Sequence, residues 1–157
     1  MMEGMAMPET MTQTDPFGRA VAAFFDTHAA ALPTPACRYA YLVGALTACL
    51  LSQQRKRYNG REPFRERLRA FFFTLPELDT IFRAVTATFS DYGDMDPCAR
   101  RIQTLAADYR LTVTATEART ASVDLLSNAF AFGLAHGERV FWKIYKTIYG
   151  KNRNRRE

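Results

Sequence analysis

Residues 36–51, ACRYAYLVGALTACLL, form the longest apolar run in the chain. A membrane-spanning helix needs about 20 such residues, and this run is shorter and contains Arg38. Thr34 precedes a proline, which is the order of an N-cap followed by proline at the first helical position. We therefore expect a buried central helix that begins at residue 35 and ends before the turn residues Asn59 and Gly60.

Similar helix signals recur on both sides of this run. A proline follows Asp15, Glu62 and Asp96 and marks a first helical position. Thr74 stands three residues before Glu77, which is the spacing of a capping box. Together with the central helix, these signals predict helices over residues 16–32, 35–58, 63–73, 75–92 and 97–110.

The last third of the chain predicts one further long helical segment. Residues 111–116, LTVTAT, alternate like a strand but are short and have no partner, so we expect a linker. From residue 118 the apolar positions keep one helical phase, which predicts one helix or two helices broken near His136 and Gly137. Gly133 and Gly137 lie four residues apart on the buried side and would allow another helix to approach closely.

These elements predict an all-α fold, a compact bundle of about six helices joined by short loops. The chain has 157 residues, of which 48% are apolar, and this suits one domain with a real core. No internal repeat or long linker divides it. We expect a disordered N-terminal lead, a single helical-bundle domain and a basic disordered tail, over residues 1–14, 15–150 and 151–157.

The charges are separated along the sequence. The net charge is +5 and the pI about 9.3. Residues 55–69 carry seven positive charges and two negative ones. The charged residues within 71–99 are mostly acidic, and residues 139–156 carry seven positive charges and no acid. A random surface mixes signs more evenly, so this separation favours an oriented electrostatic role.

Signatures of enzymes and metal sites are missing from the sequence. The two histidines, His28 and His136, are far apart, and no zinc spacing or phosphate-cradling loop is found. We expect no catalytic residues, no metal and no cofactor. The three cysteines form no CxxC pair and the start resembles no secretion signal, which favours buried thiols and a cytoplasmic location.

The basic segments are the candidate functional surface, and they have two interpretations. A helix over 63–73 would place Arg61, Arg65 and Arg69 on one exposed ridge, where ion pairs with Glu62 and Glu66 would absorb part of the charge and leave only a soluble corner. Alternatively, the cations contact nucleic-acid phosphates. On that interpretation the candidates are Arg55, Lys56, Arg57, Arg61, Arg65, Arg69, Arg100, Arg101, Arg139, Lys143 and Lys146.

Aromatic residues interleave with the second basic group, Arg139, Lys143 and Lys146. Among them, Trp142 is suited either to stacking on a base or to covering the edge of the core.

Two stretches resemble a known family. RYAYLVGALTACLLSQQRKRYNGREPFRERL followed by LPELDTIFRAVTATFSDYG is similar to the C-terminal helical region of large subunits of type I-B CRISPR Cascade complexes. The family's "FxxGxLxxxLxxxQ" helix corresponds here to Tyr41–Gln53, with Gly44 near its middle. Phe130, Gly133 and Gly137 take the places of its closing-helix motif. In that family, the C-terminal helical region of the large subunit is also made as a separate protein, the small subunit.

The resemblance implies a non-catalytic small subunit that supports nucleic acid. Its partners would be CRISPR RNA and target DNA, the large and backbone subunits of Cascade, and further copies of itself, with no membrane. Base pairing would read the sequence, while the subunit held the guide–target duplex and the displaced strand by phosphate contacts. The alternative is a helical protein–protein adaptor or regulator that binds no nucleic acid.

Overall fold

The computed structural model describes residues 15–69 and 73–150. Every regular element in this part of the chain is helical, which confirms the all-α prediction. The elements are α2 (Pro16–Thr27), α3 (Pro35–Arg57), α4 (Arg65–Leu68), α5 (Leu75–Tyr92), α6 (Pro97–Leu111), α7 (Ala115–Thr120), α8 (Val123–Phe132), the π-helical segment η1 (Gly133–Gly137), α9 (Glu138–Tyr145) and the π-helical segment η2 (Lys146–Gly150). The expected N-terminal lead and basic tail lie outside the described residues.

Side-chain caps explain where the helices begin. The hydroxyls of Thr34, Thr74 and Thr114 accept hydrogen bonds from the backbone amides three residues later, at 3.1, 3.2 and 3.0 Å. Carboxylates of Asp15 and Asp96 do the same for α2 and α6. Each cap satisfies an amide that has no partner within its own helix. The helix starts predicted after Asp15, Thr34, Thr74 and Asp96 are therefore confirmed, whereas α7 begins inside the stretch 111–116 that was expected to be a linker.

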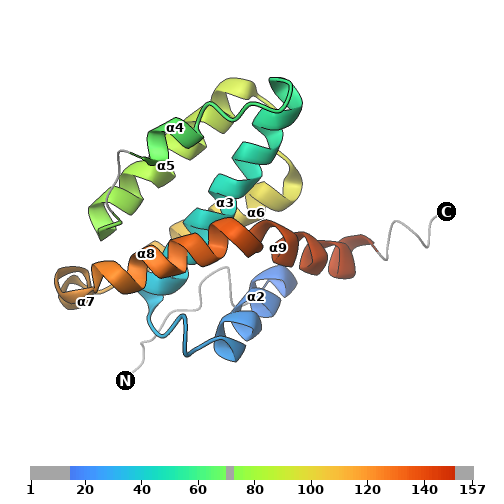
Figure 1. Cartoon of the computed structure of the whole chain (residues 1–157). Helices are drawn as coiled ribbons and strands as arrows, with labels where there is room; N and C mark the ends of the chain where they lie inside the picture. Colours follow the sequence, from blue (N-terminus) through green and yellow to red (C-terminus); the bar gives the residue numbers. More distant parts are fainter. Residues whose placement is uncertain (1–14, 70–72, 151–157) are drawn as a thin grey trace.

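Helix α3 is the centre of the molecule. It contacts α5, α6, α8 and η1, and Figure 1 shows it running through the middle of the bundle. All of its residues from Tyr39 to Ala48 are buried, which confirms the predicted central helix. Within the described residues, no helix is long and apolar enough to cross a membrane.

Three glycines allow α3 to touch the C-terminal helix backbone to backbone. A Cβ on Gly133 would overlap the carbonyl oxygen of Tyr41, and a Cβ on Gly44 would lie 2.8 Å from the amide nitrogen of Leu134. Gly137 likewise leaves room for Ala45. The close helix approach expected at Gly133 and Gly137 is confirmed, and Gly44 supplies its other side.

An ion-pair cluster joins α3, α5 and α6. Arg110 of α6 donates to the Asp79 carboxylate of α5 through Nε at 2.9 Å and through Nη2 at 3.1 Å. The Tyr39 hydroxyl of α3 donates to the same carboxylate at 2.6 Å. Burial and this hydrogen bond raise the pKa of Tyr39, so the phenol keeps its proton and the three helices stay joined.

Two predicted helices are shorter than expected. Helix α2 ends at Thr27 and not at residue 32, because the backbone then forms tighter turn bonds, from the amide of Ala29 to the carbonyl oxygen of Asp26 and from that of Ala31 to His28. The helix predicted over 63–73 is a single turn, α4. Phe64 is buried at its start, and residues 70–72 lie outside the described part of the chain. The prediction of a continuous arginine ridge along that helix is therefore wrong.

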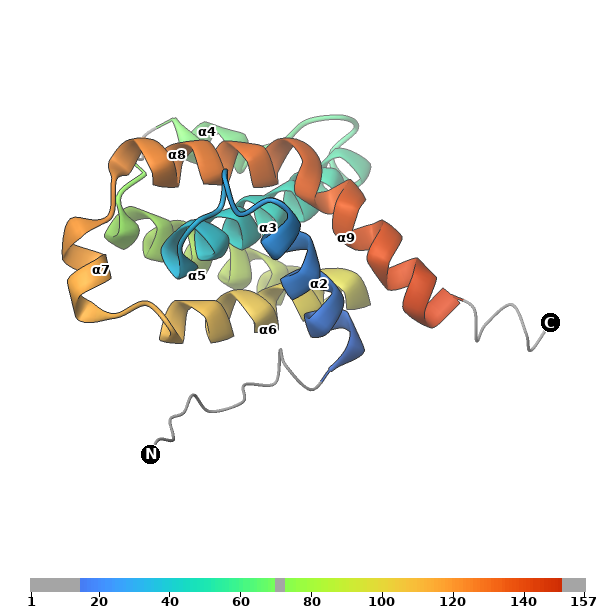
Figure 2. The same cartoon turned by 90° about the horizontal axis from the view of Figure 1, so that it is seen from below.

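The C-terminal segment is one continuous helix from residue 123 to residue 150. The backbone stays helical through Gly133–Gly137, where the turn widens to a π-helix instead of breaking. The predicted break near His136 and Gly137 is therefore wrong. A single helix from residue 118 is wrong as well, because the extended backbone of Ala121 and Ser122 separates α7 from α8. Figure 2 shows α8 and α9 crossing the bundle, with α7 at one end of the molecule and α9 at the other.

Candidate nucleic-acid interface

The turn after α3 places the first basic group on the surface. Asn59 (φ 54°) and Gly60 (φ 87°) adopt left-handed conformations and reverse the chain. Such conformations favour asparagine and glycine. A surface cavity of about 760 Å³, which we call the turn cavity, lies beside this reversal. Its lining includes Arg57, Arg61 and Arg65.

Glu62 neutralises part of this group. Its carboxylate accepts from Arg55, and from Arg65 Nε at 2.5 Å. The hydrogen bond from Arg65, followed by that from Arg55, lowers the pKa of Glu62. Arg69 pairs more loosely with Glu66, at 3.4 Å. The ion pairing expected from the spacing is present, and it occupies three of the candidate arginines.

Lys56 and Arg61 differ from their neighbours. Both side chains are exposed. Among the described residues, neither makes a side-chain hydrogen bond or ion pair. Arg57 is also exposed but lies over the ring of Tyr92, with 4.1 Å from its guanidinium carbon to the ring centroid. Lys56 and Arg61 are thus the cations of the first group that can contact a phosphate without giving up an internal contact.

The second basic group lies on α9 and η2. Arg139, Lys143 and Lys146 are exposed. Lys146 Nζ lies 5.9 Å from the centroid of the Trp142 ring, a weak cation–π contact. In the described part of the chain Arg139 and Lys143 have no side-chain partner.

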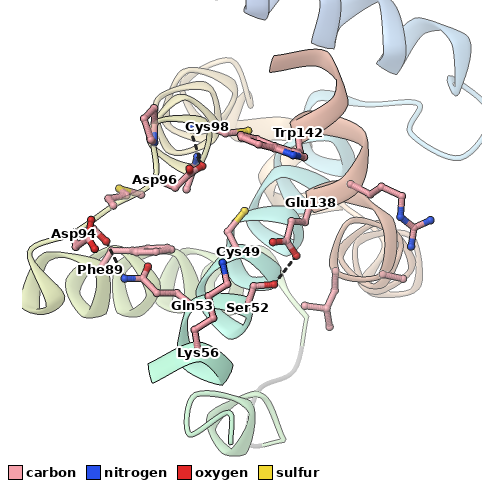
Figure 3. Close-up of a pocket in the computed structure, with 16 residues that line it drawn as sticks. Cys49, Ser52, Gln53, Lys56, Phe89, Asp94, Asp96, Cys98, Glu138 and Trp142 are labelled. Carbon is pink, nitrogen blue, oxygen red and sulfur yellow. Dashed lines mark hydrogen bonds between the residues drawn. The ribbon is translucent and has the colours of Figure 1, made fainter. Parts of the chain in front are cut away.

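The fold brings the two basic groups to one side of the molecule. Ser52 of α3 donates to Glu138 of α9 at 2.8 Å, and Arg55 in turn donates to Ser52 at 2.9 Å. Lys56 of α3 and Arg139 of α9 line a second cavity of about 770 Å³. We call it the α3–α9 cavity (Figure 3).

The two remaining candidates lie at the start of α6. Arg100 is exposed and makes one long contact, 3.4 Å, to the carbonyl oxygen of Met95. Arg101 is half-buried, bonds both carboxylate oxygens of Asp15 at 3.2 Å and lies over the ring of Tyr149. Arg101 therefore ties α2 and η2 to α6, and we leave it out of the proposed interface.

Groups suited to hold a metal are not found at this surface. Across residues 15–69 and 73–150, no three histidine, cysteine or acidic side chains gather at a single point. The arrangement instead offers exposed cations around the turn after α3 and along α9, which suits a polyanion.

A comparison with known proteins decides the family. Residues 1–147 match the C-terminal domain of CRISPR-associated protein TM1802. The chain belongs to this CRISPR-associated family. No curated protein and no solved structure matches the chain. In this TM1802-type domain, the two exposed basic groups lie at the end of α3 and on α9 and η2. We call the close approach of α3 to the C-terminal helix at Gly44, Gly133 and Gly137 the glycine crossing, and it joins the two helices that carry these groups.

The sequence alone did not show which cations of the TM1802-type domain are paired with acids and which are not. The spacing of Glu62 and Arg65 signalled one ion pair. The second partner of Glu62, Arg55, lies across the turn, and no local spacing reveals it. The shared cavity of Lys56 and Arg139 depends on the packing of α9 against α3. Glycines at 44, 133 and 137 were the available signal for that packing.

Proposed function

We propose that this domain is a non-catalytic, nucleic-acid-binding subunit of a CRISPR RNA-guided complex in the cytoplasm. The observation that carries the proposal is a set of exposed cations, Lys56, Arg61, Arg139 and Lys143, that have no internal partner within the described residues. Lys56 projects from α3, Arg61 from the turn that follows it, and the other two from α9. The glycine crossing and the Ser52–Glu138 bond hold the two helices together. Membership of a CRISPR-associated family makes guide RNA and target DNA the natural polyanions.

The proposed role is that of a small subunit in a Cascade-type assembly. Phosphate contacts would stabilise the guide–target duplex and the displaced strand, while base pairing supplies the sequence specificity. Copies would stack beside one another and beside the large and backbone subunits. Weak binding by one copy would be offset by the avidity of several.

A helical adaptor is the second candidate function, and a separate surface favours it. Leu111, Val123 and Leu125 are 84%, 46% and 42% exposed. They lie on α6 and α8 next to α7, at the end of the molecule remote from α9 (Figures 1 and 2). This apolar end suits contact with a neighbouring subunit, and it is compatible with a nucleic-acid interface at the opposite end.

A salt titration tests the proposed function. The chain is mixed with a labelled single strand, and anisotropy is recorded between 50 and 300 mM salt. Backbone binding predicts a steep linear fall of log affinity with log salt, with a slope of about −0.7 per phosphate contacted and little dependence on sequence. If no strand binds at low salt, either to the chain alone or to the chain with its partner subunits, nucleic-acid support is excluded and the adaptor remains.

We expect the variant Glu62→Gln to bind the strand more tightly than the wild type. The substitution releases Arg55 and Arg65, which can then contact two further phosphates. Two contacts correspond to a slope steeper by about 1.4 and an affinity gain of up to about 25-fold at 0.1 M salt. The lowered pKa keeps Glu62 ionised at neutral pH, so the wild type should gain affinity only when the pH falls below the usual glutamate pKa.

The control for Glu62→Gln is Asp124→Asn. It changes the net charge equally but lies on α8, at the end remote from the basic turn. Equal gains for the two variants would mean that overall charge matters and that the Glu62 pairs do not.

A further inference from the structure

The α3–α9 cavity has a lining unlike that of a phosphate site. It lies between α3, the turn from α5 to α6, and α9, and Figure 3 shows side chains from all three converging on it. Three carboxylates, Asp94, Asp96 and Glu138, line it against the two cations Lys56 and Arg139. A phosphate inside the cavity would be repelled, whereas a neutral group that carries N–H donors would find acceptors.

Hydrogen bonds already made in the cavity show which acceptors remain available. Asp96 uses one carboxylate oxygen to cap α6, and Glu138 accepts from Ser52 through one oxygen. Gln53 donates to the backbone carbonyl oxygen of Asp94 at 2.9 Å and does not bond the Asp94 carboxylate. Within the described chain, that Asp94 carboxylate has no hydrogen-bond or ion-pair partner. At least one carboxylate is therefore available to a ligand.

Trp142 supplies an aromatic wall. Figure 3 shows its side chain extending from α9 toward Cys98 at the start of α6. The ring stacks on Tyr145, with centroids 5.7 Å apart and planes at 9°, and the residue remains 44% exposed. Burial raises the pKa of Cys98 to about 12 and raises that of Cys49 as well. The thiols of Cys49 and Cys98 are therefore neutral, and they add uncharged groups to the cavity lining.

We propose that the α3–α9 cavity holds one unpaired nucleobase that carries an amino group, with Trp142 stacked on it and Asp94 accepting from its amine. This inference rests on the proposed function and deepens it, because it makes single-stranded nucleic acid the preferred ligand. Lys56 and Arg139 lie at the same cavity from opposite helices, where they contact the phosphates on either side of the held base. Stacking requires an unpaired base, since a paired base is already stacked in its duplex.

Amino-bearing bases fit this lining better than thymine or uracil. Cytosine presents an exocyclic amine to which a carboxylate can bond. Thymine presents a carbonyl oxygen at the same place, and that oxygen would face carboxylate oxygens. We therefore expect oligo(dC) to bind more tightly than oligo(dT), by about fivefold or more.

Tryptophan fluorescence tests the proposal directly, because Trp142 is the only tryptophan in the sequence. We expect oligo(dC) to quench the fluorescence, and an abasic phosphodeoxyribose chain of equal length to bind without quenching it. The same measurement with oligo(rC) shows whether the cavity takes its cytosine from RNA or from DNA, according to which strand quenches more strongly. Binding of oligo(dC) without quenching would overturn the proposal yet leave phosphate binding intact. No binding by any strand would instead overturn the proposed function.

Variants separate stacking from hydrogen bonding. Anisotropy should show Trp142→Ala weakening oligo(dC) about fivefold or more with unchanged abasic-chain binding, while Trp142→Phe retains most of the affinity. Asp94→Asn should keep the quenching but lose the preference for oligo(dC) over oligo(dT). Leu111→Ala, at an exposed site on α6 outside the cavity lining, is the matched control. Equal binding of oligo(dC) and oligo(dT) by the wild type would overturn the base preference.

Discussion

Gly133→Ala is expected to destabilise the domain by about 2 kcal/mol or more and to lower Tm by roughly 4–8 °C. Alanine is the better helix former by about 1 kcal/mol, so helix propensity alone predicts the opposite sign. The added Cβ would overlap the carbonyl oxygen of Tyr41 and lie 3.0 Å from its Cα. Both are backbone atoms inside α3, and they cannot move aside without shifting the central helix.

Gly150→Ala is the matched control for this prediction. Gly150 also belongs to a π-helical segment, of which it is the last residue, but the nearest atom to its added Cβ is the Lys146 Cβ, at an ordinary 3.7 Å. Its Tm should stay the same or rise slightly. Thermal unfolding followed by circular dichroism compares the two variants. A Gly133→Ala protein as stable as the wild type would show that α3 and η1 are not in backbone contact.

Replacing Lys56, Arg61, Arg139 and Lys143 together with glutamine is expected to abolish most strand binding. If each cation contacts one phosphate of a single strand, the salt slope becomes shallower by about 2.8. At 0.1 M salt this corresponds to a loss on the order of several hundredfold in affinity. The four side chains are exposed and lack internal partners in the described part of the chain, so Tm should change by no more than about 2 °C.

Two double variants control for net charge in the four-cation variant, one outside the candidate interface and one within it. Arg83→Gln with Arg119→Gln removes two exposed positive charges from α5 and α7, and Lys56→Gln with Arg61→Gln removes two from the candidate interface. Filter binding across the same salt series should show the second pair losing far more affinity than the first. Equal losses would mean that net charge attracts the strand and that no particular surface binds it. A collapse of Tm in the four-cation variant would instead assign these cations to the fold.

Helix starts were readable from the sequence because their causes are local. Thr34, Thr74 and Asp96 cap amides within three residues of themselves, and the following prolines fix the backbone in place. The central helix was readable because its apolar run has no polar face. The short extent of the helix predicted over 63–73 could not be predicted from the sequence. The burial of Phe64 and the hydrogen bond from its amide to Gln54 of α3 depend on tertiary packing.

The candidate interface was readable only as a list of cations. Sequence spacing could not distinguish Arg61, which has no internal partner among the described residues, from Arg65, which Glu62 holds. Nor could it distinguish exposed Arg139 from Arg101, which Asp15 and Tyr149 engage. These differences arise where separate helices meet. The α3–α9 cavity has the same origin, because its walls come from three segments that are far apart along the chain, within 49–56, 89–99 and 134–142.

The glycine crossing has a thermodynamic consequence for any long polyanion. Because α3 and the C-terminal helix touch through their backbones, the distance between their two groups of cations is already set in the free protein. A strand held by one group therefore meets the other at a high effective concentration, with little conformational entropy left to lose. Loosening the crossing by mutation should thus weaken binding even when every cation is kept. The three small residues at the centre of the fold would then act on affinity without touching the ligand.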